Sequence, residues 1–400
     1  MAAKAAGAGD GDVPRTHCAG PAHPPVGRSC AKGGSREEFG EVDDETGGDP
    51  LRDDTLPAYL RELGVATPGE ELDVEPAGDG NINWVRRVRE RRSGRSWIVK
   101  QARPALERFP QYRASTERIA CERRWLELAR PHDPGRVCPD VVRFDEPRRV
   151  LVLEDLGAAE RLDRALARGA DATRALEALA ALLGALHAAT SGRHAELAPR
   201  FANDEMRRLH GDHIFALPFR PNDFPLPAAV RAAAERVWAD AELVAIADRA
   251  YARYLAPTGA LVHGDVQAGN VLLAARGPVL LDAEIAHVGD PAFDVGTLAA
   301  HVVLPAIGRG APGLAAPPVA AMWRAYASAN ASPLRPSFPD AARYAAIEIL
   351  RRTIGAARVA AVAEDRAALA ALALTTRWMR DPPGDPDALA RDLGGSGAPA

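Results

Sequence analysis

The sequence has few cysteines, few lysines and no long uncharged hydrophobic run, and each shortage excludes a class of protein. Four cysteines in 400 residues do not make a disulfide framework, so we expect a cytoplasmic protein. No stretch of about eighteen apolar residues lacks charges, and no apolar segment follows Met1, so we expect neither a membrane span nor a secretory signal. A formal net charge of −4 provides no basic field for nucleic acid or for an anionic membrane surface.

The scarcity of lysine makes the positions that keep it informative. Lysine and arginine together number 50, but only three of them are lysines: Lys4, Lys32 and Lys100. We interpret the bias toward arginine as a property of codon usage and not of a binding surface. Lys100 is the one lysine outside the N-terminal tail, so a specific role is expected at this position.

Composition and hydrophobic periodicity divide the chain into four parts. Apolar residues make up 47% of the sequence and charged residues 26%, which is typical of a globular protein with a sizeable core. Residues 1–50, rich in Ala, Gly and Pro, lack hydrophobic periodicity and are predicted to be a disordered tail. We expect a β-rich N-lobe at residues 51–156, a helical C-lobe at residues 157–380 and a frayed C-terminus at residues 381–400.

The N-lobe is predicted to be a largely antiparallel five-stranded sheet with one inserted helix. A first helix is expected at residues 56–63, with Asp54-Thr55 as its cap and a proline in its first turn. The strands are expected at residues 71–76, 82–88, 97–100, 141–144 and 150–153, and the inserted helix at residues 114–129.

The C-lobe is predicted to be mostly helical, with one island of β-type sequence. Helices are expected at residues 171–189, 228–255 and 339–379, and β-type segments at residues 261–263, 271–273 and 279–281. Asp171 is expected to cap the first of these helices. A β-rich lobe followed by a helical lobe is the outline of a protein kinase-like, two-lobed α+β fold.

Two residues in the β-type island have the spacing of a kinase catalytic loop. Asp265 lies five residues before Asn270, as the corresponding Asp and Asn do in protein kinases. We interpret Asp265 as the group that accepts the proton of an attacking hydroxyl. Asn270, at the far end of the loop, would offer its side-chain oxygen to a magnesium ion.

Two carboxylate residues follow Asn270 in the same β-type island. Asp282 ends a strand-like run and would hold Mg²⁺ between the β- and γ-phosphates of ATP, and Glu284 could reach the same metal ion. Each residue alone has an ordinary explanation, because solvated carboxylates are common. The set of Asp265, Asn270, Asp282 and Glu284 within one short segment favours a catalytic site over chance.

A glycine-rich link between the first two strands is the predicted phosphate-binding segment. It contains Gly78, Gly80, Asn81 and Asn83, and glycines allow backbone N–H groups to approach phosphate oxygens. On its own this segment is better explained as a hairpin turn. Lys100 changes the interpretation, because it lies at the end of the third strand, where a kinase needs a phosphate-binding lysine.

Three further residues complete the predicted nucleotide site. Glu122, on the inserted helix, is the expected partner of Lys100, and Glu117 is its rival. Residues 151–156, which end at Leu156, would form the hinge whose backbone hydrogen-bonds adenine. Glu154 would contribute its carbonyl there and not its carboxylate.

Other conspicuous residues are interpreted as structural. Asp294 is expected to brace the catalytic loop through backbone N–H groups, and His263 to belong to the architecture of that loop. His187 and His301 lie on predicted helices and are expected to be packed or surface residues and not ligands.

With these motifs in place, the chain resembles the aminoglycoside phosphotransferase superfamily. Residues 263–270 together with residues 281–294 are similar to the signature of that superfamily nearly throughout. The resemblance covers most of residues 51–380 in outline. It implies ATP–Mg²⁺-dependent phosphorylation of a hydroxyl on a small-molecule acceptor.

A narrower resemblance is to the methylthioribose kinases. It rests on residues 54–60, on residues 78–85 continuing to residues 99–102, and on residues 351–357. That family phosphorylates the 1-hydroxyl of 5-methylthioribose in methionine salvage and is dimeric, which leaves a homodimer open here. A paired arginine serves its active site, which implies that role for Arg351 and Arg352. A solvated helix face in an arginine-rich chain is the alternative for this pair.

The acceptor is less defined than the reaction. Residues 266–270 and 289–291 are closer to the general superfamily, and residues 201–223 could form part of a substrate lid but match no family segment. An aminoglycoside or nucleoside antibiotic is the alternative acceptor, and homoserine or choline remains open. The alternative from another functional class is a pseudokinase scaffold that binds nucleotide. The intact set of catalytic residues argues against this alternative.

Overall fold

The structure is a computed structural model that describes residues 50–78, 82–105 and 114–395. The predicted tail, apart from Pro50, lies outside the described residues, as do Gly80 and Asn81 of the predicted phosphate segment. Within the described ranges, no single helix is long and apolar enough to cross a membrane. One pair of helical segments, residues 173–190 and 194–201, has the combined length and composition but bends by 95°.

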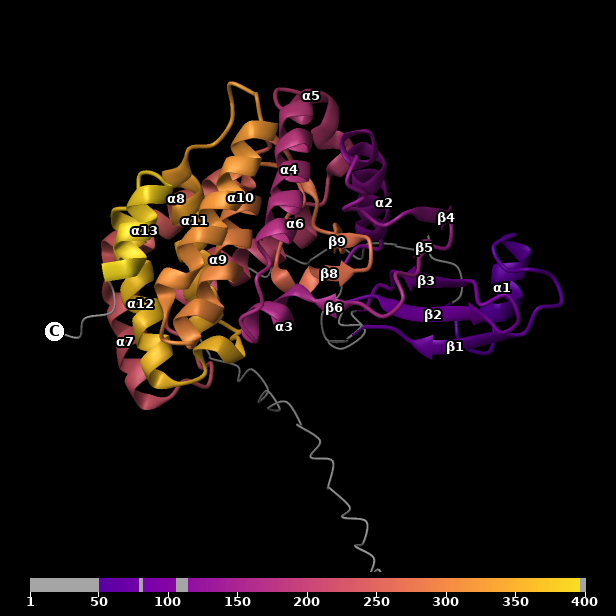
Figure 1. The fold of residues 1–400 in the computed structure, drawn as a ribbon, viewed down its shortest axis with the longest axis horizontal. Coiled ribbons are helices and arrows are strands. Elements are labelled where there is room, and N and C mark those ends of the chain that lie inside the picture. The colour runs from indigo at the N-terminus through magenta and orange to yellow at the C-terminus, as the bar shows by residue number, and fades with distance from the viewer. Residues whose placement is uncertain (1–49, 79–81, 106–113, 396–400) are drawn as a thin grey trace, which may run out of the picture. The chain divides into compact units, whose positions relative to one another are not determined.

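The N-lobe is a five-stranded sheet in which every neighbouring pair of strands is antiparallel. The strand order is β1-β2-β3-β5-β4, and the sheet appears at the indigo end of the chain in Figure 1. The predicted sheet is therefore confirmed. The strands are β1 (Leu72–Pro76), β2 (Trp84–Glu90), β3 (Ser96–Gln101), β4 (Val141–Asp145) and β5 (Val150–Glu154).

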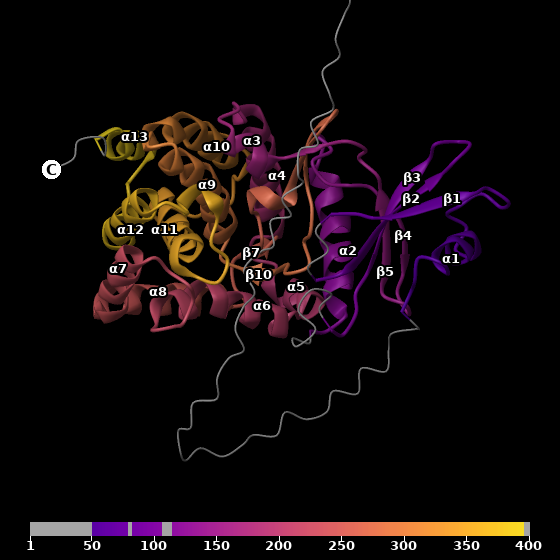
Figure 2. The same ribbon diagram turned by 90° about the horizontal axis from the view of Figure 1, so that it is seen from below.

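Alternation along the strands assigns the two faces of this sheet to two different helices. Val99 and Val152 belong to the core that includes Leu56 of α1 (Leu56–Glu62), whereas Leu151 and Leu153 belong to the core that includes α2 (Glu117–Ala129). Figure 2 shows α1 and α2 on opposite sides of the sheet. Successive side chains of a strand point to opposite faces, so Lys100, next to Val99, faces α2.

The first helix and the second strand differ from the expected details. The side chain of Thr55 makes no capping bond to α1; its Oγ1 accepts a hydrogen bond from the backbone N–H of Arg52 at 3.1 Å. Strand β2 begins at Trp84 and not at residue 82. The preceding Asn83 is engaged by α2, because Arg118 donates from Nε to Asn83 Oδ1 at 3.0 Å.

The C-lobe is mostly helical and its long helices are shorter than predicted. The segment expected as one helix from residue 228 breaks at Asp240, which caps α8 by accepting from the N–H of Leu243 at 3.1 Å. The segment expected from residue 339 breaks after Ile354, where Gly355 is extended. The helices of six residues or more are α3 (Leu162–Ala167), α4 (Thr173–Thr190), α6 (Asp204–Gly211), α7 (Ala228–Ala239), α8 (Ala241–Leu255), α9 (Ala292–Gly308), α10 (Ala316–Ala329), α11 (Phe338–Ile354), α12 (Asp365–Arg380) and α13 (Pro386–Gly395).

The start of α4 and the C-terminal segment differ from what the sequence predicts. Ala172 is the N-cap of α4, but the expected Asp171 carboxylate still accepts from the N–H of Thr173 at 2.9 Å. The C-terminus expected to fray contains α13, whose Leu389 and Leu393 are buried. These two leucines sit four residues apart on one face, and their burial explains why a segment rich in Gly, Pro and Asp is helical.

The β-type island forms two small sheets that hold the predicted catalytic segments. Strands β8 (Val271–Ala274) and β9 (Gly277–Leu280) form an antiparallel hairpin, with β6 (Glu160–Arg161) along its edge. Strand β7 (Ala260–Val262) pairs with β10 (His287–Gly289), which was not predicted. The predicted two-lobed α+β fold is thus confirmed, with β6 and β10 as additions.

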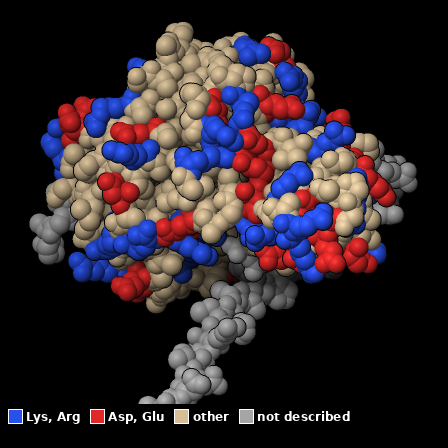
Figure 3. Space-filling model, turned by 45° about the vertical axis from the view of Figure 1, so that its right-hand side comes forward, with Lys and Arg blue, Asp and Glu red and all other residues tan. Residues whose placement is uncertain are grey.

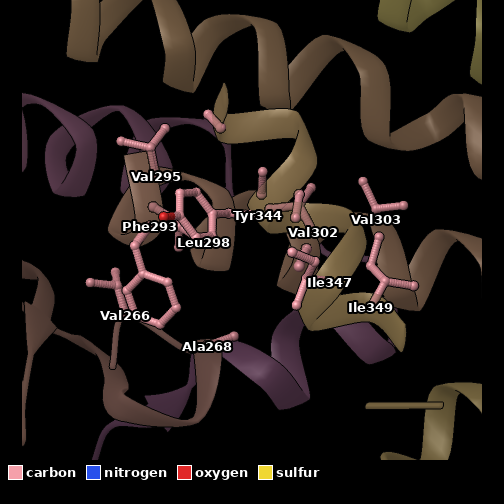
Figure 4. Packing of buried hydrophobic residues seen from close by; sticks show 14 of the residues in the cluster. Val266, Ala268, Phe293, Val295, Leu298, Val302, Val303, Tyr344, Ile347 and Ile349 are labelled. Atoms are coloured by element: carbon pink, nitrogen blue, oxygen red, sulfur yellow. The ribbon is translucent and has the colours of Figure 1, made fainter. Parts of the chain in front are cut away.

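Apolar packing anchors the segment between β7 and β8. Figure 4 shows Val266 and Ala268 of this segment close to Phe293 of α9, within the cluster of buried residues from α9 and α11. Val266 and Phe293 are almost completely buried. Burial of one such side chain stabilises a fold by about 1.5–3 kcal/mol, so the loop that carries Asp265 is fixed by the core beneath it.

The charged surface is mixed in sign. On the face shown in Figure 3, lysines and arginines are interspersed with aspartates and glutamates. Many of these charges pair, as Arg91 does with Glu71 and Asp73 at the β1–β2 edge. Exposed pairs of this kind stabilise a protein by about 0–1 kcal/mol each, so their main effect is on solvation.

Candidate active site

Asp294 holds the start of the catalytic segment in place. Its carboxylate accepts the backbone N–H groups of His263 at 2.7 Å and Gly264 at 3.0 Å, and the ring of His187 approaches it at 3.3 Å. Burial would raise the pKa of Asp294, but the hydrogen bond with His187 holds it below its usual value. Gly264 has a φ of 85°, and a Cβ there would lie 2.6 Å from the carbonyl oxygen of Ile285. The predicted bracing role of Asp294 is confirmed.

Asp265 has one oxygen that is saturated and one that is open. Its Oδ2 accepts from Gln267 Nε2 and from Asn270 Nδ2, both at 2.8 Å. Its Oδ1 faces His210 Nε2 at 3.9 Å, which is too long for a hydrogen bond. The side chain is 15% exposed, and a small molecule would approach it through Oδ1.

The surroundings of Asp265 keep it ionised. Burial would raise the pKa of this carboxyl, but the guanidiniums of Arg352 and Arg351, with the Gln267 hydrogen bond, lower it below its usual value. An ionised carboxylate can accept a proton from a hydroxyl at neutral pH. The geometry therefore suits the role predicted for Asp265.

Asn270 and Asp282 lie at the same end of the β8–β9 hairpin. Val271 pairs with Leu280, so the residue before β8 lies beside the residues after β9, and the N–H of Leu281 donates to the carbonyl of Asn270 at 2.8 Å. Asp282 has a left-handed φ of 66° and a side chain that is 39% exposed. Two of the three predicted metal ligands, Asn270 and Asp282, are brought together here.

The donor set of this end of the hairpin fits magnesium. The side-chain nitrogen of Asn270 is bonded to Asp265, which leaves the amide oxygen for another partner. Within the described ranges, no group of three His, Cys, Asp or Glu side chains is placed to hold a metal ion. Mg²⁺ needs no such group, because it retains waters and is bound by one or two carboxylates together with substrate phosphates. Oxygen donors from Asp282 and Asn270 meet that requirement.

Lys100 is paired as predicted, and Glu117 is not its partner. Lys100 Nζ lies 2.8 Å from Glu122 Oε1 and also contacts the carboxylate of Asp282. Burial would lower the pKa of Lys100, but the two carboxylates raise it above its ordinary value, so the ammonium is fully charged. Glu117 instead pairs with Arg149 and Arg124. The lysine thus connects the sheet, α2 and the segment after β9.

Glu284 is engaged by the N-lobe. Asn83 Nδ2 donates to Glu284 Oε2 at 2.8 Å, and Arg118, which donates to Asn83 Oδ1, lies 3.8 Å from the same carboxylate. Burial raises the pKa of Glu284 to about 7, against the lowering effect of Arg118. Asn203 donates to the backbone carbonyl of Glu284 at 2.6 Å. The side chain predicted to cover phosphates, that of Asn83, therefore binds a residue predicted to reach the metal.

The remaining predicted nucleotide residues lie around the sheet. Gly78 follows β1 with a φ of 66°, which favours glycine. The carboxylate of Glu154, at the end of β5, accepts from the N–H of Asp140 at 2.7 Å and from Arg276 at 2.6 Å. The carboxylate of Glu154 is thus bonded to other parts of the protein. This agrees with the prediction that Glu154 would offer adenine its backbone carbonyl and not its side chain. Leu156 follows on the connection to the C-lobe and is half-buried.

Arg351 and Arg352 lie against the catalytic segment and not on a solvated face. Their side chains are 11% and 9% exposed. Arg352 donates to Gln267 Oε1 at 2.9 Å and to Glu348 at 2.6 Å, and Arg351 donates to Glu348 at 3.1 Å. Burial would raise the pKa of Glu348, but both guanidiniums hold it well below its usual value. Through Gln267, Arg352 is one side chain away from Asp265.

Two residues of the site were not predicted. Gln267 joins Asp265 to Arg352, and nothing in the sequence singles it out beyond its place between Asp265 and Asn270. His210 belongs to residues 201–223, which were expected to form part of a lid, but nothing in their pattern singled out this histidine. Both act through neighbours that are far away in the chain.

Comparisons with known proteins agree with this geometry. Residues 73–337 match the model of the phosphotransferase enzyme family. The chain belongs to this family. It is an ATP-dependent phosphotransferase, and the predicted superfamily membership is confirmed.

Sequence relatives support the narrower resemblance. Methylthioribose kinase of Geobacillus sp. (strain WCH70) is 27% identical over 352 residues, which cover 78% of this chain and 85% of that protein. Methylthioribose kinase of Yersinia enterocolitica is 28% identical over 351 residues, covering 76% and 85%. A solved choline/ethanolamine kinase family protein from Mesorhizobium loti aligns with a TM-score of 0.46 and 18% identity, over 86% of this chain and 99% of that one.

Proposed function

We propose that this phosphotransferase transfers the γ-phosphoryl group of ATP to a sugar hydroxyl, with 5-methylthioribose as the acceptor. The observation that carries the proposal is the open Oδ1 of Asp265, in a network that reaches Arg352 on one side and Asn270 on the other. The methylthioribose kinase relatives support the choice of acceptor. In this role the enzyme would serve methionine salvage in the cytoplasm.

The nucleotide would be held by the groups around Lys100. Lys100, oriented by Glu122, would bind phosphate oxygens, and Gly78, Gly80, Asn81 and Asn83 would approach the phosphates from the N-lobe. The backbone of Glu154 and Leu156 would hydrogen-bond adenine. The fixed ammonium places positive charge beside the phosphates without reorganisation, and such preorganised charge lowers the barrier of phosphoryl transfer.

The metal site would lie at the end of the β8–β9 hairpin. Asp282 and the amide oxygen of Asn270 would hold Mg²⁺, and Glu284 would join them through Oε1, the oxygen that Asn83 does not contact. When bound, the ion neutralises charge that develops on the β- and γ-phosphate oxygens. Asn270 has a second role, since its Nδ2 fixes the carboxylate of Asp265.

The acceptor would bind between Asp265 and α11. Asp265 Oδ1 would accept the proton of the attacking hydroxyl, while Arg351 and Arg352 would stabilise charge spread over the transferring group. The two positive charges of Arg351 and Arg352 exceed the single negative charge of Glu348. The α11 side of the proposed acceptor site therefore carries a net positive charge. A polycationic aminoglycoside is disfavoured there, whereas a neutral sugar is not.

The test is ADP release from ATP–Mg²⁺ with 5-methylthioribose, beside aminoglycosides, nucleosides, choline and homoserine. The Asp265→Ala variant serves as the blank, because loss of a general base costs about 10²–10⁴-fold in turnover while ATP binding should change only a few-fold. Turnover of methylthioribose alone supports the proposal. Turnover of another compound instead would identify that compound as the acceptor in place of methylthioribose. If no compound is turned over and ATP still binds, the pseudokinase scaffold is favoured.

A further inference from the structure

A histidine from α6 faces the open oxygen of Asp265. His210, in the last turn of α6, places Nε2 at 3.9 Å from Asp265 Oδ1. The other carboxylate oxygen already accepts two hydrogen bonds, from Gln267 and Asn270. Oδ1 is therefore the oxygen left for an acceptor, and His210 is the group that faces it.

The hydrogen bond on the other side of the ring determines its tautomer. Tyr254 is fully buried, and its hydroxyl lies 3.3 Å from His210 Nδ1. A buried hydroxyl needs an acceptor, and within the described part of the chain Nδ1 is the one its contacts provide. Tyr254 thus donates to Nδ1, and the ring hydrogen lies on Nε2, directed toward Asp265. This tautomer also avoids placing a nitrogen lone pair against a carboxylate.

The ring is neutral and is a hydrogen-bond donor and not a cation. Burial and the positive charge of Arg351 lower the pKa of His210 to about 3. A neutral imidazole with Nε2–H can donate one hydrogen bond without bringing a second positive charge next to Asp265. It can also remain in place while the proton of an acceptor moves.

The fold positions this histidine closely. The next residue, Gly211, has no Cβ, and one there would lie 2.5 Å from Tyr251 Cε2 and 3.1 Å from Tyr254 Cε1. Only glycine lets α6 approach α8 to this distance, which brings His210 to Tyr254. The π-helical turn η3 (Asp212–Ala216) follows immediately, and such turns occur frequently at functional sites. The edge of Phe293 also packs against the His210 ring at 6.2 Å between centroids.

We propose that His210 is a further catalytic residue, which donates its Nε2–H to the oxygen of the acceptor hydroxyl while Asp265 Oδ1 accepts the proton of that hydroxyl. An oxygen can lie about 2.8 Å from both atoms when they are 3.9 Å apart. As the proton passes to Asp265, the acceptor oxygen forms a bond to the γ-phosphorus and the bond from the γ-phosphorus to the β–γ bridging oxygen breaks, releasing ADP. The inference rests on the proposed phosphoryl transfer to a hydroxyl.

This arrangement also selects the class of acceptor. An alcohol oxygen has lone pairs to receive the Nε2–H while it gives up its own proton. A protonated amine has no lone pair and would oppose the N–H with one of its own. His210 and Asp265 together therefore admit a neutral hydroxyl and exclude an ammonium group from the reacting position.

The test compares two replacements of His210 that separate donation from packing. His210→Phe keeps a ring against Tyr254 and Phe293 but removes the donor, and His210→Gln restores an N–H at similar reach. We expect His210→Phe to lower kcat by about 10²–10³-fold, the usual cost of one lost donor in an active site, with the Kd for ATP unchanged. The unfolding temperature should fall, because the buried hydroxyl of Tyr254 loses its acceptor, so kcat is measured well below that temperature. His210→Gln should recover at least about tenfold of that loss. His194→Phe, at the exposed start of the short helix α5 (His194–Leu197), is the matched control.

The readout does not depend on the identity of the sugar. ATP hydrolysis, in which water takes the place of the acceptor, is measured first, and then phosphorylation of 5-methylthioribose or of whichever panel compound is turned over. If methylthioribose is not a substrate but hydrolysis still responds to His210→Phe, the acceptor is wrong and the role of His210 stands. If kcat stays within about threefold, or if it falls only together with ATP binding, the proposal is overturned.

Discussion

The ammonium of Lys100 lies 2.8 Å from the carboxylate of Glu122, and this pair is almost closed to solvent, with side chains 8% and 1% exposed. The pair joins β3 to α2 on the face of the sheet opposite α1. A compact ammonium fits between Glu122 and Asp282, whereas a planar guanidinium is larger and presents its donors in a fixed fork. A chain that otherwise uses arginine has kept lysine where size decides.

The first prediction concerns Lys100→Arg. We expect ATP-dependent turnover to fall by at least about 100-fold, because the guanidinium displaces the phosphate-binding charge from its position. The Kd for ATP and steady-state kinetics check this result. Arg95→Lys, an exposed conservative change just before β3, should leave both unchanged, and near-normal turnover of Lys100→Arg would contradict the prediction.

Asp294→Asn is expected to loosen the catalytic loop. The amide would accept only one of the two N–H groups of His263 and Gly264 and would turn its own N–H₂ toward the other. Hydrogen bonds to a charged group are worth about 1.5–3 kcal/mol each, so the free energy of unfolding should fall by about that amount and turnover should fall with it. Denaturant unfolding measures the change. Asp248→Asn, in an exposed pair with Arg220, should shift stability by less than about 0.5 kcal/mol.

Removing the link between Asn83 and Glu284 should weaken contact between the two lobes. Asn83→Ala removes the hydrogen bond to Glu284 Oε2 and one of the acceptors of the buried Arg118, at a cost of about 1–3 kcal/mol. We expect a lower unfolding temperature and faster proteolysis near β2 in the absence of nucleotide. Asn222→Ala, which removes loop bonds to Leu217 and Arg220 far from the lobe contact, is the comparison. Equal proteolysis of both variants would rule out the link.

Stability is expected to fall as the pH decreases from about 6.5. Burial lowers the pKa of His287 to about 4, whereas an unfolded chain binds this proton near pH 6.5. Between these values the unfolded state holds more protons, so stability rises with pH, by about 2 kcal/mol from this residue between pH 5 and neutrality. His287→Asn, whose amide can replace the ring Nδ1 near the Ile285 carbonyl, should flatten the dependence of the unfolding temperature on pH. An unchanged slope would refute the assignment.

Much of the fold and the central site residues could be predicted because they depend on local pattern. Short apolar runs in β3 and β5 predict the strands, and the five-residue interval between Asp265 and Asn270 is set within a single loop. The rarity of lysine singled out Lys100. Each of these signals is read along a few consecutive residues.

The features that escaped prediction depend on contacts between distant segments. Asn83 and Glu284 are 201 residues apart, and no local pattern indicates that they meet. The same holds for His210, whose role depends on Tyr254 and Asp265. Helical periodicity continues across Asp240, where only the capping bond to Leu243 reveals the break. The composition after residue 381 hid the buried leucines of α13.

The position of Lys100 has a consequence for chemical modification of the protein. Lys4 and Lys32 lie in the first 49 residues, so Lys100 is the single side-chain amine from residue 50 to the C-terminus. An acylating reagent that reacts with the body of the protein can do so at one nitrogen, and that nitrogen is enclosed by two carboxylates. The rate at which Lys100 is acylated thus reports on access to the predicted phosphate-binding lysine, without any engineered label.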